Sequence, residues 1–544
     1  MTVLRSLIYH QAKKLNKEKT EALHIAQDPI MHFPKPELQE IKIAQFLRVT
    51  GVTYGRPKDI KLTEKLNFEK AINKMRNNFN SWNQRDLTIL GRVMLAKLHG
   101  IAMLQYLANC IEVPEWTIKT ANKLIYKFVY KGADKITRAV ASRPLEMGGI
   151  NLPILDDVLA AAATQWLRKA RCNKDKLWSK FITNDFARLG GYGILDSLRT
   201  KKDNREAGLF KFNEHLLKCW HSLKKEETMN EKSFLSQTVW NNRRFSYKDK
   251  QKIHLLKGGL LMKSGLVQVG DFFDVDGRII EAEASQTKGL SLGQKMEWSL
   301  ATKHIKKFVL EQHIRVARGF VDTNQVIKDK NLEDQLIHLS DGENCTELNE
   351  LTQKKILQIM AKRRKDTTPN LRKMCLQLDL TEEEYSCLYS NIRTMGFTTK
   401  ARSFLFKLYA GLLYGNDRLH IFGFSESRKC KRCNHQVEDI QHMLVDCPDT
   451  RKFRVVVYSK LGKSFDRSAE LLGKSDDFGL SFILLQMNRF IYQRKFLEIP
   501  LNSSEFYAQL CLEKKVEETL ARKARTQQRH NRKWNNILST GIIC

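Results

Sequence analysis

Apolar residues recur at three- and four-residue intervals over long stretches of this chain. From Leu62 to Phe79 the spacing is typical of one buried helical face, and the same period continues from Trp82 to Leu107, with Gly91 and Gly100 as weak points. Further helices are predicted over Ile118 to Tyr130, Leu155 to Ala170, Leu480 to Phe496 and Phe506 to Trp534. The predicted fold class is therefore mainly α with minor β.

Other segments break this helical pattern. Ala22 to Ile25 is strand-like, and the glycine-punctuated segment Gly258 to Gly277 predicts short strands or turns. Acidic residues between Glu333 and Glu350 predict a solvated, flexible connector. Within the last helix a buried stripe is predicted for Leu512, Val516, Leu520 and Ala524. At 544 residues the chain is expected to form several domains.

The charge of the chain indicates its partner. A formal net charge of +33 favours an extended polyanion, RNA or DNA, with an anionic membrane surface as the weaker alternative. We expect no membrane span, because uncharged apolar stretches stay short of the roughly 18 residues needed. Scattered cysteines and the lack of an apolar signal core predict a reducing, intracellular setting in nucleus and cytoplasm. Lys362-Arg363-Arg364-Lys365 could be a nuclear signal, a phosphate-contacting helix face or a plain solvated face.

Four residues have the types and spacing of a metal site. Cys430, Cys433, His442 and Cys447 form a C-x2-C-x8-H-x4-C pattern, which predicts a structural zinc ion held by four ligands. A turn would place the first two thiolates, and a helix after Asp439 would carry the other pair until Pro448 ends it. The alternatives are His435 as a competing third ligand, or three buried cysteines and a satisfied histidine without metal.

Several motifs occur in an order that resembles one family. Lys14-Leu15-Asn16 with Lys19-Thr20-Glu21, Leu66-Asn67-Phe68-Glu69, Arg85-Asp86-Leu87-Thr88, Gly148-Gly149-Ile150-Asn151-Leu152-Pro153, the four proposed zinc ligands and Lys533-Trp534 carry the resemblance. Together they look like the reverse transcriptases of LINE-type non-LTR retrotransposons. The resemblance implies the end of the polymerase palm over 1–50, a helical thumb over 51–215, a linker over 216–395, a zinc-stabilised CCHC domain over 396–470 and basic C-terminal helices over 471–544.

The sequence departs from that family in its catalytic carboxylates. Polymerase chemistry needs two metal ions held by carboxylates, which in the family come from an [FY]-x-DD hairpin upstream of the KLN segment. Asp156-Asp157 and Asp476-Asp477 lack the preceding aromatic residue and flanking strands, and they are interpreted as helix-capping or loop residues. We therefore expect a C-terminal fragment that is inactive alone. Mg²⁺ would bind only if an upstream catalytic palm completed the site.

The expected activity is nucleic-acid binding by thumb and zinc region. Candidate contacts are Lys14, Lys19, Arg85, Arg92, Lys97, Lys431, Arg432, Arg451, Lys452, Arg522, Lys523 and Arg529. Each of them could instead be a merely solvated cation. Two other functions remain open. The chain could be the accessory half of an active RNA-directed DNA polymerase with a separately encoded catalytic half, or a host-recruited scaffold in which zinc only holds the fold.

Overall fold

A computed structural model describes residues 20–23, 42–132, 135–225, 230–249, 252–322, 335–364, 381, 384, 387–390, 392, 397–475 and 477–538. Among the predicted contacts, Lys14 and Lys19 lie outside these residues, as does Lys365 of the basic cluster. The protein is mainly helical with four small two-stranded sheets among the described residues, which confirms the predicted fold class. No helix of the described part is long and apolar enough to cross a bilayer.

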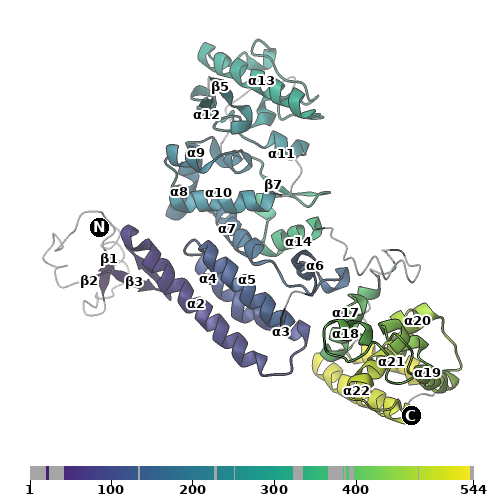
Figure 1. Ribbon diagram of the computed structural model, residues 1–544. Coiled ribbons are helices and arrows are strands. Elements are labelled where there is room, and N and C mark those ends of the chain that lie inside the picture. The colour runs from purple at the N-terminus through teal and green to yellow at the C-terminus, as the bar shows by residue number, and fades with distance from the viewer. Residues whose placement is uncertain are drawn as a thin grey trace. The chain divides into compact units, whose positions relative to one another are not determined.

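The described residues form two compact units. Unit 1 comprises Met1–Ser81, Leu98–Leu124 and Leu155–Arg363, and unit 2 comprises Trp82–Lys97, Ile125–Ile154 and Arg364–Cys544. Each unit combines separate stretches of the chain, whereas the five segments expected from the sequence are consecutive. The division into five segments therefore stays a prediction. Figure 1 shows the elements of each unit along the chain.

The central helices of unit 1 pack side by side. They are α7 (Leu155–Cys172), α8 (Leu177–Ala187), α10 (Lys211–Lys224) and α14 (Gln353–Arg363), which Figure 1 draws in colours from blue to green. The small side chains Ala160 to Ala163 of α7 are buried and allow close approach, and the fully buried Trp220 of α10 fills the core beside them. A second apolar cluster surrounds Trp298 of α13 (Leu292–Gln312).

The remaining elements of the first 363 residues are short apart from two helices. The longer ones are α2 (Ile60–Asn83) and α5 (Glu115–Tyr130). The others are β1 (Glu21–Leu23), β2 (Lys42–Ala44), β3 (Phe46–Val49), β4 (Val52–Gly55), α3 (Ile89–Ala96), a π-helix (Lys97–Ile101), α4 (Ala102–Ala108), α6 (Arg138–Ser142), α9 (Lys201–Glu206), α11 (Glu231–Leu235), β5 (Tyr247–Asp249), β6 (Lys252–His254), α12 (Leu260–Lys263), β7 (His338–Ser340) and β8 (Cys345–Glu347). β1 and β2 are parallel, whereas the other three pairs are antiparallel hairpins.

The C-terminal part of unit 2 is built around one helix. That helix is α21 (Phe478–Phe496), whose first 14 residues are almost all buried. Around it lie α17 (Thr399–Tyr409), α18 (Asn416–Ile421), α19 (Pro448–Leu461), α20 (Arg467–Leu472), α22 (Ser503–Ala524) and α23 (Gln527–Leu538), drawn in green and yellow in Figure 1. Aromatic contacts among Phe453, Phe490 and Phe506 join α19, α21 and α22.

Three expectations from the sequence pattern are corrected by the structure. The helix expected from Trp82 to Leu107 is interrupted, because the Thr88 hydroxyl accepts a hydrogen bond from Gly91 N and starts a new helix there. The long C-terminal helix breaks at Arg525, whose φ is +56°. The acidic connector contains a hairpin, β7 and β8, whose turn residues Asp341 and Glu343 pair with Lys362.

The prediction of a buried stripe on α22 is also wrong. Leu512 is 63% exposed and Leu520 is 56% exposed, whereas Leu510 and Ala521 are buried. A strict four-residue repeat advances around an α-helix by about 40° at each step, so it does not stay on one face. The face that packs in unit 2 is therefore a different one.

Candidate metal centre

A tight turn brings the first two candidate ligands together. Cys430 O accepts a hydrogen bond from Asn434 N at 2.9 Å, and Cys430 N donates to His435 O at 2.9 Å. The turn requires φ of +59° at Asn434, a conformation that asparagine adopts more readily than most residues. Both thiols of the C-x2-C pair are thereby directed to one side of the turn.

The second pair of ligands comes from a helix end, but not as one continuous helix. His442 opens a π-helix, His442–Asp446, and Cys447 lies at the N-cap of α19 with its N–H donating to His442 O at 2.7 Å. The expectation that Pro448 only ends a helix is corrected: Pro448 is the first residue of α19, where a missing N–H costs nothing.

The four ligand atoms converge at one point. All lie within 4.8 Å of one another, with 4.0 Å between the Sγ atoms of Cys430 and Cys447 and 3.3 Å from Cys433 Sγ to His442 Nε2. Thiolates in tetrahedral contact with one zinc ion stand about 3.8 Å apart, given a Zn–S bond of about 2.3 Å. The geometry and the donor set therefore fit a closed structural zinc site, and zinc is the cofactor that these residues hold.

His435 lies beside the site rather than in it. Its ring stacks on that of His442 with 4.6 Å between centroids and 12° between planes, and the convergent group consists of the other four residues. His442 N donates to Asp439 Oδ1 at 2.7 Å, which fixes the start of the π-helix. The stacked imidazole and this hydrogen bond hold the ligand histidine in place.

The surroundings of Cys447 favour its thiolate form. A hydrogen bond with Cys430 lowers the pKa of Cys447 most, and the backbone N–H groups of Thr450 and Asp449 at the start of α19 lower it further. Burial acts in the opposite direction. Cys447 is thus prepared to bind a cation, since the thiolate is the form that ligates metal.

A buried ion pair supports the zinc turn from behind. Glu438 is buried, pairs with Lys495 of α21 and accepts a hydrogen bond from Asn416 N at 3.3 Å. Gly415 allows this approach, because a Cβ atom there would lie 2.2 Å from Glu438 O. The sequence offered no signal for these partners, which are distant along the chain and share no motif.

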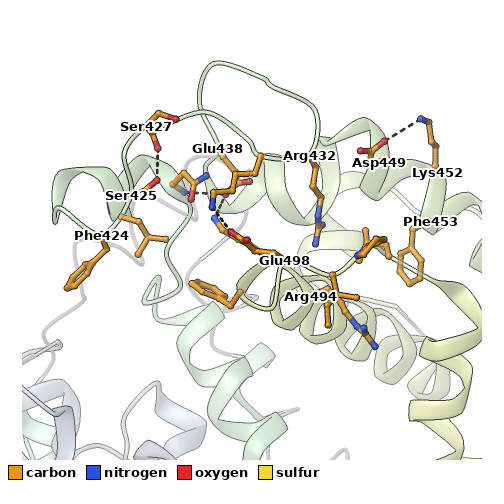
Figure 2. A pocket seen from close by; sticks show the side chains of 18 of the residues that line it. Phe424, Ser425, Ser427, Arg432, Glu438, Asp449, Lys452, Phe453, Arg494 and Glu498 are labelled. Atoms are coloured by element: carbon orange, nitrogen blue, oxygen red, sulfur yellow. Dashed lines mark hydrogen bonds and ion pairs between the residues drawn. The ribbon is translucent and has the colours of Figure 1, made fainter.

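A cavity of about 1140 Å³ adjoins the zinc turn and gathers three of the predicted cations: Lys431, Arg432 and Lys452 line it. The Arg432 guanidinium donates to Ile491 O of α21 at 3.3 Å, and Figure 2 shows Lys452 paired with Asp449. Lys431 pairs with Glu498, and Phe424 lies on the rim largely exposed. Basic and aromatic side chains from the zinc turn, α19 and the end of α21 thus share one opening.

The other predicted contacts are dispersed. Arg451 on α19 and Lys523 on α22 are exposed, Arg522 is exposed and pairs with Glu518, and nothing is described of the Arg529 side chain. Arg85 is exposed and lies over the Trp82 ring at 4.9 Å. Lys97 is half-buried, and burial lowers its pKa.

Arg92 is placed in the core of unit 2 and is corrected as a phosphate contact. It is 1% exposed, and its guanidinium donates to Asn83 Oδ1 at 2.6 Å and to Phe128 O at 3.0 Å. A side chain held in this way connects the ends of two helices and does not reach the phosphates of a nucleic acid bound at the surface. Arg92 is therefore a structural arginine in this fold.

Comparison with known proteins supports the metal assignment. A family described as zinc-binding in reverse transcriptase matches residues 380–453, a span that includes all four ligands. The match covers less than half of the chain, so it identifies a region related to reverse transcriptases. A search of curated proteins finds no match to this chain.

Proposed function

We propose that this chain is a non-catalytic, nucleic-acid-binding part of a LINE-type reverse transcriptase, and that its zinc region grips RNA or DNA. The observation that carries the proposal is the convergent Cys3His site, inside a region similar to reverse-transcriptase zinc-binding segments and beside a cavity with basic residues. The net charge of +33 supports a polyanionic partner.

The zinc ion acts in this proposal by holding a binding surface. Four protein ligands leave no open coordination position, so the metal fixes the turn that presents Lys431 and Arg432. The ion pairs of Lys431 and Lys452 are exposed and contribute little to stability. Phosphates can therefore replace Glu498 and Asp449 as partners at small cost. Arg85 and Lys97 of the thumb-like segment would add weaker contacts.

The non-catalytic part of the proposal rests on the sequence, in which the carboxylate hairpin of the polymerase family is not recognised. A catalytic half encoded separately or upstream would bind Mg²⁺ and complete the enzyme. Primer extension by the zinc-loaded chain with Mg²⁺ and a primed template tests this directly. Extension by the isolated chain would contradict it.

Binding is tested by fluorescence anisotropy of labelled RNA and DNA over a range of salt concentrations. We expect the logarithm of affinity to fall linearly with the logarithm of salt concentration, and Lys431→Glu/Lys452→Glu to reduce the steepness by about 1.4 for single strands. Lys263→Glu/Lys303→Glu makes the same charge change at exposed positions of α12 and α13 and serves as the control. Equal effects of both double variants would contradict a contact at the zinc turn.

A zinc-stabilised scaffold is the second candidate. It is favoured by the carboxylates that already pair with lysines lining the cavity, namely Glu438, Asp449 and Glu498. Zinc-dependent folding with no affinity for RNA or DNA at low salt would select the scaffold over the binding function.

A further inference from the structure

Unit 1 displays a group of aromatic side chains far from any of the predicted contacts in sequence. Trp166 of α7 contacts Trp178 of α8 and Phe212 of α10, with centroid distances of 5.4 and 5.9 Å. Phe181 of α8 contacts Phe210, just before α10, at 6.4 Å. We call these five residues the aromatic platform.

The platform is exposed although it is apolar. Phe181 and Phe210 are each 57% exposed, and Phe212 and the adjacent Leu177 are also exposed. Trp166 and Trp178 by contrast are partly buried against the apolar core beneath. Apolar residues scattered singly over a surface are common and carry no function. A contiguous exposed apolar patch, by contrast, often marks a binding surface.

Buried polar contacts fix the two phenylalanines relative to each other. Asp185 Oδ2 accepts hydrogen bonds from Phe210 N at 2.9 Å and from Asn213 Nδ2 at 2.8 Å. The Asn213 amide also donates to Phe181 O at 3.3 Å. The start of α10 is thereby joined to α8, so the rings stand on helices whose positions are set by the fold.

The two segments that carry the platform are rich in basic residues. Residues 166–181 and 210–212 contain seven lysines and arginines against one aspartate. Lys180 and Lys211 are exposed and have no ion pair among the described residues, while Lys169 lies 5.9 Å from the Trp166 ring centroid. The zinc cavity differs, because its lysines already pair with carboxylates.

We propose that the aromatic platform binds single-stranded nucleic acid, with unpaired bases stacking on Phe181 and Phe210 and phosphates held by Lys180 and Lys211. Exposed rings beside unpaired cations match the alternation of base and phosphate along a strand. A duplex conceals its base faces within its own stack, so the rings favour unpaired bases. This surface is separate from the zinc region and does not depend on it.

The test uses the full zinc-loaded chain and three probes: a labelled oligothymidine strand, the same strand annealed to its complement, and a strand with central abasic sites. We expect Phe181→Leu/Phe210→Leu to weaken binding of the intact single strand by at least about tenfold, since the loss of a single stacked base is already of that order and the variant removes two rings. Duplex affinity should be unchanged. The variant should also lose its ability to distinguish intact from abasic strands.

Matched variants separate stacking from charge. Leu292→Ala/Leu310→Ala removes exposed apolar groups from α13 and should leave all three affinities unchanged. Lys180→Glu/Lys211→Glu should reduce the steepness of the salt dependence by about 1.4, unlike Lys263→Glu/Lys303→Glu. The aromatic effect should persist in the Lys431→Glu/Lys452→Glu background, so that failure at the zinc turn and failure at the platform are distinguishable.

Four results would overturn the proposal. They are unchanged single-strand affinity in Phe181→Leu/Phe210→Leu, an equal loss for intact and abasic strands, absence of binding by the chain at low salt, and a change of oligomeric state in sedimentation without a change in affinity. The last would show that the platform is an interface between copies of the chain.

Discussion

The zinc region of unit 2 and the helical core of unit 1 are stabilised in different ways. Around Cys430 the backbone is a turn with a left-handed residue at Asn434. This turn is stabilised by the four converging ligand atoms and by the buried Glu438. In unit 1, α7 and α10 bury alanine, leucine and Trp220 over long regular helices. A short irregular segment needs a metal because it cannot bury enough apolar surface, whereas long helices can.

Loss of the zinc ligands should have the largest effect on this contrast. Cys430→Ser/Cys447→Ser is expected to abolish bound zinc and to unfold the turn, since structural zinc contributes about 10–16 kcal/mol in small zinc-dependent folds. Metal content by atomic emission and hydrogen exchange over residues 428–447 measure this. α7 of unit 1 should keep its protection. Cys172→Ser, at an exposed free cysteine, is the control; stoichiometric zinc in the double variant would refute the assignment.

Trp220→Ala should disrupt the core of unit 1 and leave the zinc region intact. It should destabilise unit 1 by about 3–5 kcal/mol, because a fully buried indole is removed and its hydrogen bond of 3.1 Å to Asp196 Oδ1 is lost. Zinc content should stay at one ion per chain. Chemical denaturation followed by a probe in unit 1 measures the loss, and release of zinc at the same denaturant concentration would show that the two regions are not independent.

Two neighbouring leucines of α22 test which face of that helix is packed. Leu510→Ala should cost about 2–5 kcal/mol, whereas Leu512→Ala should change stability by less than about 0.5 kcal/mol, because only Leu510 is buried. Thermal unfolding of the zinc-loaded chain compares them. A larger effect at Leu512 would mean that this face is covered in solution.

The smallest effect concerns pH and unit 1. Glu112 lies 3.7 Å from His215 Nδ1 and 3.3 Å from Lys218 Nζ, and these contacts, the one with His215 most, lower the pKa of Glu112 to about 2. Burial opposes protonation of His215, but contacts with Cys219 and Glu112 raise its pKa to about 9. Because the folded pKa of His215 exceeds its ordinary value of 6.5, the contribution is present below pH 6.5 and is lost as the pH rises through 9.

The acid side has the opposite sign. The contribution of Glu112 is present above its ordinary pKa of 4.5 and is lost as the pH falls toward 2. Since Glu112 is about half exposed, the contribution of the Glu112–His215 contact to the free energy of unfolding should stay below about 1 kcal/mol. The free energy of unfolding is measured for the unmodified chain and for Glu112→Gln at each pH. The difference between the two gives the contribution of the Glu112 carboxylate to stability. A difference that stays constant from pH 6.5 to 9 would disprove the contact.

The helical nature of the chain was predictable from sequence because apolar spacing reports local periodicity. Helix ends were less so: the cap at Thr88 and the break at Arg525 depend on backbone conformation that a hydrophobic pattern does not encode. The identity of the four metal ligands was predictable, since thiols and imidazoles at short spacing suit zinc chemistry. Their exact route was not, because Cys447 belongs to the start of the next helix.

The sequence by itself determined the predominance of helices, the excess positive charge and the residues that hold zinc, since these depend on composition and on neighbours along the chain. Only tertiary structure decided which charged and apolar residues are available. Arg92 is buried although it was predicted to contact phosphate, and Leu512 is exposed although its spacing predicted a place in the core. Phe181 and Phe210, 29 positions apart, meet on one surface because α8 and α10 are joined through Asp185. Burial and proximity arise from packing between distant segments, which local sequence does not specify.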